Sequence, residues 1–347
     1  MLKKLISGVT ASLLALSLIG CSQDDDTSFE AEERVVNVYS ARHYDSDKAM
    51  YERFEAETGI RVRTRQSGAS QLLETMRAEG GESPADLVIA ADAGTLWQFQ
   101  EDGLLQPIAA DRLAGDLPAL AADDASWIGL SKRLRVIVVA NDVPEDAIRN
   151  YGDLADPRWE GEICVRSSRN IYNLSLLGDL IDRMGPEAAE EWAAAVKGNF
   201  ARDPQGGDTD QIRAVAAGAC NIAIVNHYYW HRLANSASED DREVTSATRI
   251  IFPDQSTGGT HRNVTGIGLA ASSPNTEEAL ELIDFLLSTE GQGLLVVETG
   301  EIPLDPQADS MAGLDDARNA ATNSAPLAVY GRNQAEAREI FDRVGWD

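Results

Sequence analysis

Two adjacent tyrosines, Tyr228 and Tyr229, are the residues of this chain best suited to unusual chemistry. A phenolate is a hard anionic oxygen donor, but a free tyrosine ionises only near pH ~10. A strongly charged cation favours the ionised form, as a bound metal does for water or a thiol. Several phenolates at one point therefore suit a trivalent cation, and Fe(III) is the biological ion that fits best. Packing of the two rings at the end of a buried strand is the alternative that the pair alone leaves open.

The residues around the pair predict that a strand gives way to a helix there. Residues 222–225 are short, apolar and β-branched, which is typical of a buried strand, and residues 230–234 have a helical pattern. Neighbouring side chains of a continuing strand point to opposite faces, so two adjacent phenols converge only where the strand has ended. We therefore expect Tyr228 and Tyr229 on a strand-to-helix turn.

The rest of the chain alternates predicted strands with predicted helices. This alternation predicts an α/β fold with a parallel or mixed sheet covered by helices on both faces. The length exceeds what one hydrophobic core usually holds, which predicts two lobes. Strands are expected at residues 34–39, 60–64, 85–90, 135–140, 161–165, 222–225 and 266–271, and helices at 47–58, 70–79, 94–101, 173–184, 186–197, 210–218 and 277–287.

Two further tyrosines stand at equivalent places in this pattern. Tyr44 follows the first expected strand, and Tyr172 follows the strand at 161–165. Ligands of open α/β sheets sit beyond the carboxyl ends of the strands. Three segments that are distant in sequence therefore each place tyrosine at the kind of position where a ligand binds.

The first 21 residues have the pattern of a bacterial lipoprotein signal. Lys3 and Lys4 open the chain, and the apolar run at 11–19 is too short to span a membrane. Cleavage before Cys21 and acylation of its thiol would anchor the protein to a membrane through lipid; an ordinary secretory signal with an incidental cysteine is the alternative. Residues 22–33 are acidic and polar, which indicates a flexible tether.

The net charge of −27 argues against nucleic acid or an anionic membrane surface as an electrostatic partner. Solubility explains such a charge equally well. Beyond Cys21 the chain holds two cysteines, Cys164 and Cys220. An even pair in an exported protein favours a disulfide, and two separate buried thiols are the alternative.

Five motifs stand out together: Tyr-Ser-Ala-Arg-His-Tyr at 39–44, Gly-Leu-Ser-Lys-Arg-Leu-Arg-Val at 129–136, Arg-Ser-Ser-Arg-Asn-Ile-Tyr-Asn at 166–173, Asn-His-Tyr-Tyr at 226–229 and Gly-Gly-Thr-His at 258–261. With them the chain, over nearly all of its mature length, resembles the periplasmic iron(III)-binding proteins of bacterial ABC transporters, in the branch that uses a histidine and several tyrosines. The resemblance implies Tyr44, Tyr172, Tyr228 and Tyr229 as phenolate ligands and His43 as a fifth. Four phenolates with Fe(III) leave a charge of −1, so neutralisation requires no carbonate or phosphate.

The resemblance also implies a two-lobed periplasmic binding protein of type II-like fold. Mixed sheets would be joined by a two-strand hinge near 130–135 and 249–264, with iron in the cleft between the lobes. The implied lobes are 34–133 with 265–300, and 134–264 with 301–347. The implied function is that of a lipid-anchored periplasmic monomer that takes Fe(III) as its transported ligand, needs no organic cofactor, and delivers the iron to an inner-membrane ABC permease and its ATPase.

Other roles for the same residues remain open. His43 could simply form a hydrogen bond in its loop, and His227 with His231 has the i, i+4 spacing of a zinc pair. Arginines near the site could donate hydrogen bonds to the phenolates or could pair with surface carboxylates; these are Arg42, Arg135 and Arg169. The remaining tyrosines are assigned to packing: Tyr39, Tyr51, Tyr151 and Tyr330.

Two other function classes can be compared with iron binding. A receptor for an oxyanion or a small organic anion would use arginines and helix N-termini instead of tyrosines. A hydrolase or transferase is disfavoured, because the sequence contains neither a Gly-x-Ser-x-Gly nor a phosphate-binding Gly-x4-Gly-Lys-Ser/Thr motif.

Overall fold

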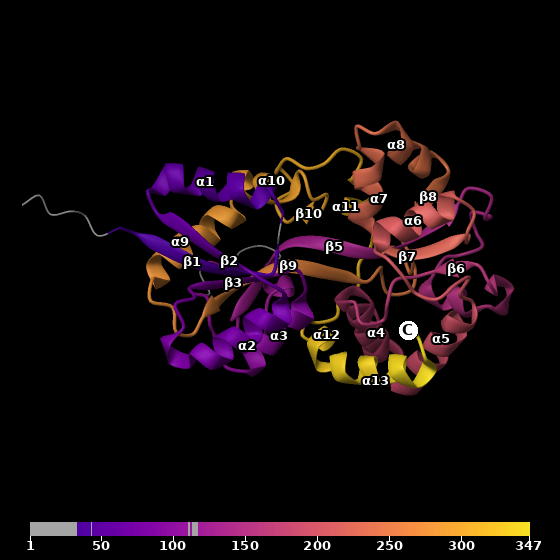
Figure 1. Cartoon of the computed structure of the whole chain (residues 1–347), viewed down its shortest axis with the longest axis horizontal. Coiled ribbons are helices and arrows are strands. Elements are labelled where there is room, and N and C mark those ends of the chain that lie inside the picture. The colour runs from indigo at the N-terminus through magenta and orange to yellow at the C-terminus, as the bar shows by residue number, and fades with distance from the viewer. Residues whose placement is uncertain (1–32, 43, 110–111, 113–116) are drawn as a thin grey trace, which may run out of the picture. The chain divides into compact units, whose positions relative to one another are not determined.

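The computed structural model describes residues 33–42, 44–109, 112 and 117–347 (Figure 1). Its strands form a mixed sheet in the order β2-β1-β3-β9-β5-β7-β6, with β4 beside β9 and with β8 and β10 beside β5. The strands are β1 (Val35–Ser40), β2 (Arg61–Gln66), β3 (Leu87–Ala90), β4 (Leu105–Gln106), β5 (Trp127–Ala140), β6 (Ile163–Cys164), β7 (Ile222–Asn226), β8 (Thr248–Ile251), β9 (Arg262–Ala270) and β10 (Ile302–Pro303).

One group of helices covers the two faces of the sheet around β1 and β3. Apolar side chains of α1 (Ser46–Thr58), α9 (Thr276–Leu287) and α10 (Thr289–Val296) pack on one face. Those of α2 (Ala69–Glu79) and α3 (Ala93–Glu101) pack on the other. This arrangement follows from the strand sequences, since alternate residues such as Val36 and Val38 point to one face and Tyr39 to the other. We call this part of the molecule the first lobe.

A second group of helices covers the sheet around β6 and β7. Core residues of α4 (Ile171–Met184), α5 (Pro186–Gly198) and α13 (Gln334–Val344) lie on one face. Those of α6 (Asp208–Ala216) and α7 (His227–Ala234), with α8 (Glu239–Ser246) beside them, lie on the other. We call this part the second lobe. Figure 1 shows the two groups of helices at opposite ends of the long strands β5 and β9.

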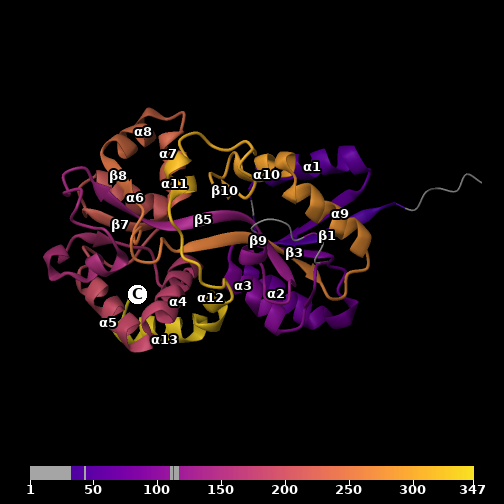
Figure 2. The ribbon, with the colours of Figure 1, turned by 180° about the vertical axis from the view of Figure 1, so that it is seen from behind.

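The strands β5 and β9 connect the lobes. The first part of β5, up to Leu134, pairs antiparallel with β9, and the rest pairs with β7 and β8. A β-bulge interrupts the β5–β9 pairing between Gly129 and Ser131. From behind, the same two strands run between the groups, with α11 (Asp315–Asn319) and α12 (Val329–Arg332) beside them (Figure 2). α12 packs against both α3 of the first lobe and α4 of the second.

The predicted α/β alternation is confirmed, and most predicted elements lie within two residues of the observed ones. The main difference is β5, which begins at Trp127 and not at 135, because its first part mixes polar residues with Ile128 and Leu130 and hides the strand pattern. The elements that no pattern predicted include β8, α8, α10 and α13. None of the described helices is long and apolar enough to cross a membrane.

Candidate functional site

Tyr228 and Tyr229 lie in the first turn of α7, directly after β7. The strand ends at Asn226 and the helix begins at His227, so the two rings lie on the same side of the chain, with centroids 4.4 Å apart. The predicted strand-to-helix turn is therefore confirmed. A helix N-terminus carries a partial positive charge, which favours an ionised phenol there.

Tyr172 occupies a similar position at the start of α4. The side chain of Asn170 caps this helix by accepting a hydrogen bond of 2.9 Å from the backbone N–H of Tyr172. The hydroxyl of Tyr228 donates to the Tyr172 oxygen over 3.2 Å, and the amide of Asn226 donates to Tyr228 over 3.2 Å. Three phenols of the second lobe thus form one group at two neighbouring helix N-termini.

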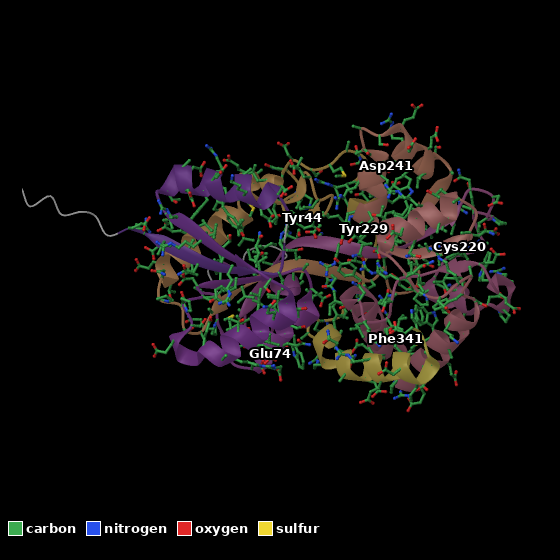
Figure 3. All side chains as sticks on the ribbon, viewed as in Figure 1. Tyr44, Glu74, Cys220, Tyr229, Asp241 and Phe341 are labelled. Atoms are coloured by element: carbon green, nitrogen blue, oxygen red, sulfur yellow. A yellow bond between two sulfur atoms is a disulfide. The ribbon has the colours of Figure 1, made fainter. Side chains whose placement is uncertain are left out.

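Tyr44 lies on the first lobe, in the short loop between β1 and α1. The guanidinium of Arg42 covers its ring, with 4.8 Å between the guanidinium carbon and the ring centroid. A negative charge on Tyr172 raises the pKa of Tyr44, and the positive charge of Arg232 on α7 lowers it. Figure 3 shows Tyr44 and Tyr229 near the middle of the molecule, between the two groups of helices. The structure therefore brings together tyrosines from three distant segments.

Burial raises the pKa of three of these phenols, those of Tyr44, Tyr228 and Tyr229. It raises the pKa of Tyr44 to about 12, with a further contribution from the charge of Glu301. Burial and then the charge of Tyr172 hold the pKa of Tyr228 and Tyr229 well above its ordinary value. At neutral pH the hydroxyls of Tyr44, Tyr228 and Tyr229 are therefore protonated unless a cation displaces the protons. Because each ionised phenol also disfavours ionisation of the next, only a highly charged cation can hold all of them as phenolates.

Three guanidinium groups surround the ring of Tyr172. Their central carbons lie 5.1, 5.9 and 5.4 Å from its centroid for Arg133, Arg135 and Arg166. Burial alone would lower the pKa of Arg133, but the charges of Tyr172 and Asp92 raise it. These cations can stabilise negative charge on the tyrosine oxygens.

A buried carboxylate holds two of these arginines in place. Asp208, at the start of α6, accepts from Arg135 over 2.6 Å and from Arg166 over 3.2 Å. It also accepts from the backbone N–H of Asn226 over 2.7 Å, directly before the tyrosine pair. The arginines are thus paired with carboxylates, and their positions are fixed by the elements that carry Tyr172 and Tyr228.

The three arginines suggested by the sequence have different surroundings in the structure. Arg42 and Arg135 are buried and lie against tyrosine rings. Arg169 is exposed and pairs with Asp347, so for it the surface-pairing alternative holds. Arg133 and Arg166 were not singled out by sequence reasoning, although both lie within the motifs at 129–136 and 166–173. The remaining tyrosines are buried in packing roles, as predicted: Tyr39, Tyr51, Tyr151 and Tyr330.

His43 lies outside the described residues, so its role stays a prediction. His227 and His231 are both buried, and the Nε2 atom of each lacks a hydrogen-bond partner within the described chain. Burial lowers the pKa of His227 to about 3 and that of His231 to about 4. No group of three or more His, Cys, Asp or Glu side chains that could hold a metal occurs among the described residues, so the zinc alternative lacks a third ligand.

Cys164 and Cys220 form a disulfide in the structure, with 5.9 Å between their Cα atoms. The bond joins β6 to the residues that lead into β7. It therefore links the strand before Tyr172 to the strand before Tyr228 and Tyr229. Cys21 lies outside the described residues, and its acylation stays a prediction.

A two-lobed mixed α/β fold with ligand groups at the junction of its lobes is the architecture of a bacterial solute receptor. The family model of the bacterial extracellular solute-binding proteins matches residues 82–336, and the chain belongs to this family. The family consists of binding proteins and is not an enzyme family.

Several relatives of this chain carry names that refer to iron. Iron uptake protein A1 of Synechocystis is 36% identical over 95% of this chain and 93% of its own length. A structure of IdiA (FutA) from Trichodesmium, in complex with iron and citrate, has a TM-score of 0.86 and 40% identity, and the match covers 90% of this chain and all of that one. The ferric binding protein of Campylobacter jejuni has a TM-score of 0.83 and 37% identity, over 89% of this chain and 99% of the other. These likenesses confirm the expected fold class.

Proposed function

We propose that this protein binds Fe(III) through the phenolates of Tyr44, Tyr172, Tyr228 and Tyr229. The observation that carries the proposal is the convergence of these phenols from three segments, with the oxygens of Tyr172 and Tyr228 only 3.2 Å apart. Iron uptake and ferric-binding proteins among the relatives support the same ligand. His43, next to Tyr44 in sequence, is proposed as a fifth ligand.

Iron binding and lobe closure are proposed to be one event. The proposed lobes comprise 34–133 with 265–300, and 134–264 with 301–347. Tyr44 belongs to the first and the other three tyrosines belong to the second, so a single ion can bind all four only when the lobes approach each other. Bending of β5 and β9, which connect the lobes, would bring this about.

The protein is proposed to act as a receptor and not as an enzyme. A lipid on Cys21 would anchor it in the periplasm, and an inner-membrane ABC permease with its ATPase would accept the iron from the monomeric receptor. The family of solute-binding proteins supports this role. Four phenolates would leave the iron site with a charge of −1. Arg135 and Arg166 share the single carboxylate of Asp208, so one of their positive charges can balance this excess without an added anion.

Loading with ferric iron from a weak chelator tests the proposal. The wild-type protein should develop a visible phenolate-to-iron charge-transfer band and should gain thermal stability, since the ligand binds only the folded state. Tyr229→Phe should bind iron much more weakly and should therefore show a weaker band at the same concentration of chelator, because the iron loses an anionic donor.

Tyr39→Phe is the matched control. Tyr39 is also a largely buried phenol of the first lobe, but its hydroxyl bonds to Glu79 and lies away from the four tyrosines. This variant should load iron as the wild type does. A colourless wild-type protein that is stabilised by an oxyanion or a small organic anion would instead favour the receptor for anions.

A further inference from the structure

A buried carboxylate, Glu301, lies at the point where β5 and β9 connect the lobes. Its side chain accepts hydrogen bonds from Ser131 on β5 and from Thr265 on β9, the latter over 3.0 Å. These two residues face each other in the strand pairing, immediately after the bulge at Leu130. Bulges bend and twist a strand locally. Glu301 therefore holds both strands at their least regular point.

The same carboxylate faces Arg42 on the first lobe. Its Oε2 atom lies 3.5 Å from Nη1 of Arg42, and both side chains are buried. Arg42 is held more firmly on its other side, where Asp47 accepts from its Nε over 3.2 Å and its Nη2 over 3.0 Å. Nη1 forms no hydrogen bond with any described residue. The guanidinium thus has a fixed anchor on α1 and a looser ion pair with the carboxylate between the lobes.

Arg42 in turn lies over the ring of Tyr44, 4.8 Å from its centroid. The preceding residue, Gly300, has a positive φ of 75° and packs closely against Tyr228. A Cβ atom added at Gly300 would lie only 3.3 Å from the Cβ of Tyr228. The short segment 300–301 therefore lies next to Arg42, which supports the first-lobe Tyr44, and next to the second-lobe Tyr228.

We propose that Glu301 is a positioning residue that couples bending of the β5–β9 pair to the placement of Tyr44, acting through Arg42. The inference rests on the proposed binding of iron by Tyr44. When the strands bend at the bulge, Ser131 and Thr265 carry the carboxylate with them. The ion pair transmits this shift to the guanidinium and so to the phenol. Neither Glu301 nor Arg42 needs to touch the metal for this coupling.

The experiment compares wild-type protein with Glu301→Gln, both loaded with ferric iron from a weak chelator. Gln keeps the size of the side chain and can still accept from Ser131, but it cannot form an ion pair with Arg42. Residues one step removed from a metal typically change affinity by about 10- to 100-fold. We expect Glu301→Gln to release iron to a strong competing chelator about tenfold faster, and to shift the maximum of the charge-transfer band.

Asp86→Asn is the matched control, since Asp86 is a buried carboxylate of the first lobe that binds Asn37 and Ser273, away from the tyrosines. This control should lower thermal stability while leaving the band and the release rate unchanged. If Asp86→Asn changed the band and the release rate as much as Glu301→Gln does, Glu301 would have only a structural role, and the inference would be overturned. Unchanged release and an unchanged band in Glu301→Gln would overturn it as well.

A double-mutant cycle with Arg42→Gln, which removes the positive charge, isolates the coupling. The two substitutions should be less than additive in release rate, because each breaks the same ion pair; additive effects contradict the inference. If Glu301→Gln does not fold, Ser131→Ala replaces it in the cycle and should act in the same direction more weakly. A wild-type protein that never becomes coloured refutes the proposed function itself. If the wild type becomes coloured but Glu301→Gln has the same band and the same rate of iron release, only the coupling is refuted.

Discussion

The two lobes contribute to the candidate iron site in different ways. The second lobe provides three phenols that already contact each other and that share a surrounding of guanidinium groups, tied together by Asp208. The first lobe provides Tyr44, whose ring rests on Arg42 and whose surroundings are fixed by Asp47 and Glu301. One half-site is therefore assembled before any metal arrives, and the other supplies a phenol from across the junction.

This difference assigns different tasks to the two half-sites. In the proposed site, three phenolates would neutralise the charge of Fe(III), so the second lobe alone would be able to hold the ion. Tyr44 adds a fourth negative charge, which is useful only when the lobes have closed. The second lobe should therefore determine whether iron binds, and the first lobe should determine how long the iron stays.

Tyr228→Phe should have the largest effect on iron. The Tyr228 hydroxyl is buried between Tyr172 and Asn226, so its loss removes an anionic donor and disturbs the neighbouring phenol. The affinity for iron should fall by more than about 100-fold, the upper range for residues that do not touch the metal. Competition with a chelator of known strength measures this, and Tyr39→Phe serves as the control.

Tyr44→Phe should have a smaller and different effect. The three remaining phenolates still neutralise the ion, so the protein should take up iron and stay coloured. Release should be about 10- to 100-fold faster, because the closed state loses its contact from the first lobe. Stopped-flow release into a strong chelator, alongside small-angle scattering, checks this. If Tyr44→Phe were as damaging to affinity as Tyr228→Phe, the division of tasks between the lobes would be wrong.

The sequence predicted the positions of these tyrosines better than it predicted their surroundings. Tyr44, Tyr172, Tyr228 and Tyr229 each follow an apolar strand, and a strand-to-helix change is visible in local composition. Local pattern also located most helices and strands, since one face of each is consistently apolar.

The contacts between distant segments could not be predicted from the sequence. Glu301 precedes a two-residue strand and has no recognisable motif, although its carboxylate meets Ser131, Thr265 and Arg42. Arg133 lies in a mixed stretch of β5 that has no clear strand pattern. Such charged residues become significant only through burial next to the phenols, and burial of a charge depends on the whole fold.

The two half-sites should respond to alkali in the same direction in the iron-free protein. Burial raises the pKa of Tyr44 to about 12 and holds that of Tyr228 well above its ordinary value. A raised pKa in the folded state contributes stability below the ordinary value near 10, and that contribution is lost as pH rises through the folded value. The free energy of unfolding should therefore fall steadily above pH ~10.

Urea unfolding of Phe variants separates the two contributions. Between pH ~10 and ~11, Tyr228→Phe and Tyr44→Phe should each reduce the alkaline loss of stability by a similar amount, because both phenols ionise in the unfolded chain near pH ~10 and stay protonated in the folded protein. Other buried tyrosines, such as Tyr151, affect the wild type and both variants equally. A variant whose alkaline loss of stability equals that of the wild type would show that burial does not keep its phenol protonated in the folded protein.

The disulfide should matter least for iron affinity and most for the integrity of the second lobe. It joins Cys164 to Cys220 across a sequence separation of 56, beneath the strands that lead to Tyr172 and Tyr228. Closing a loop of this size contributes roughly 4 kcal/mol in the chain-entropy model, mainly by restricting the unfolded chain. Replacing both cysteines by Ala should lower the unfolding temperature, but the folded protein should still bind iron with little change.

The tyrosines are held by helix N-termini and by Asp208, and neither support depends on the sulfur bridge. A large loss of affinity in a variant that is still folded would mean that the bridge itself sets the spacing of the three phenols.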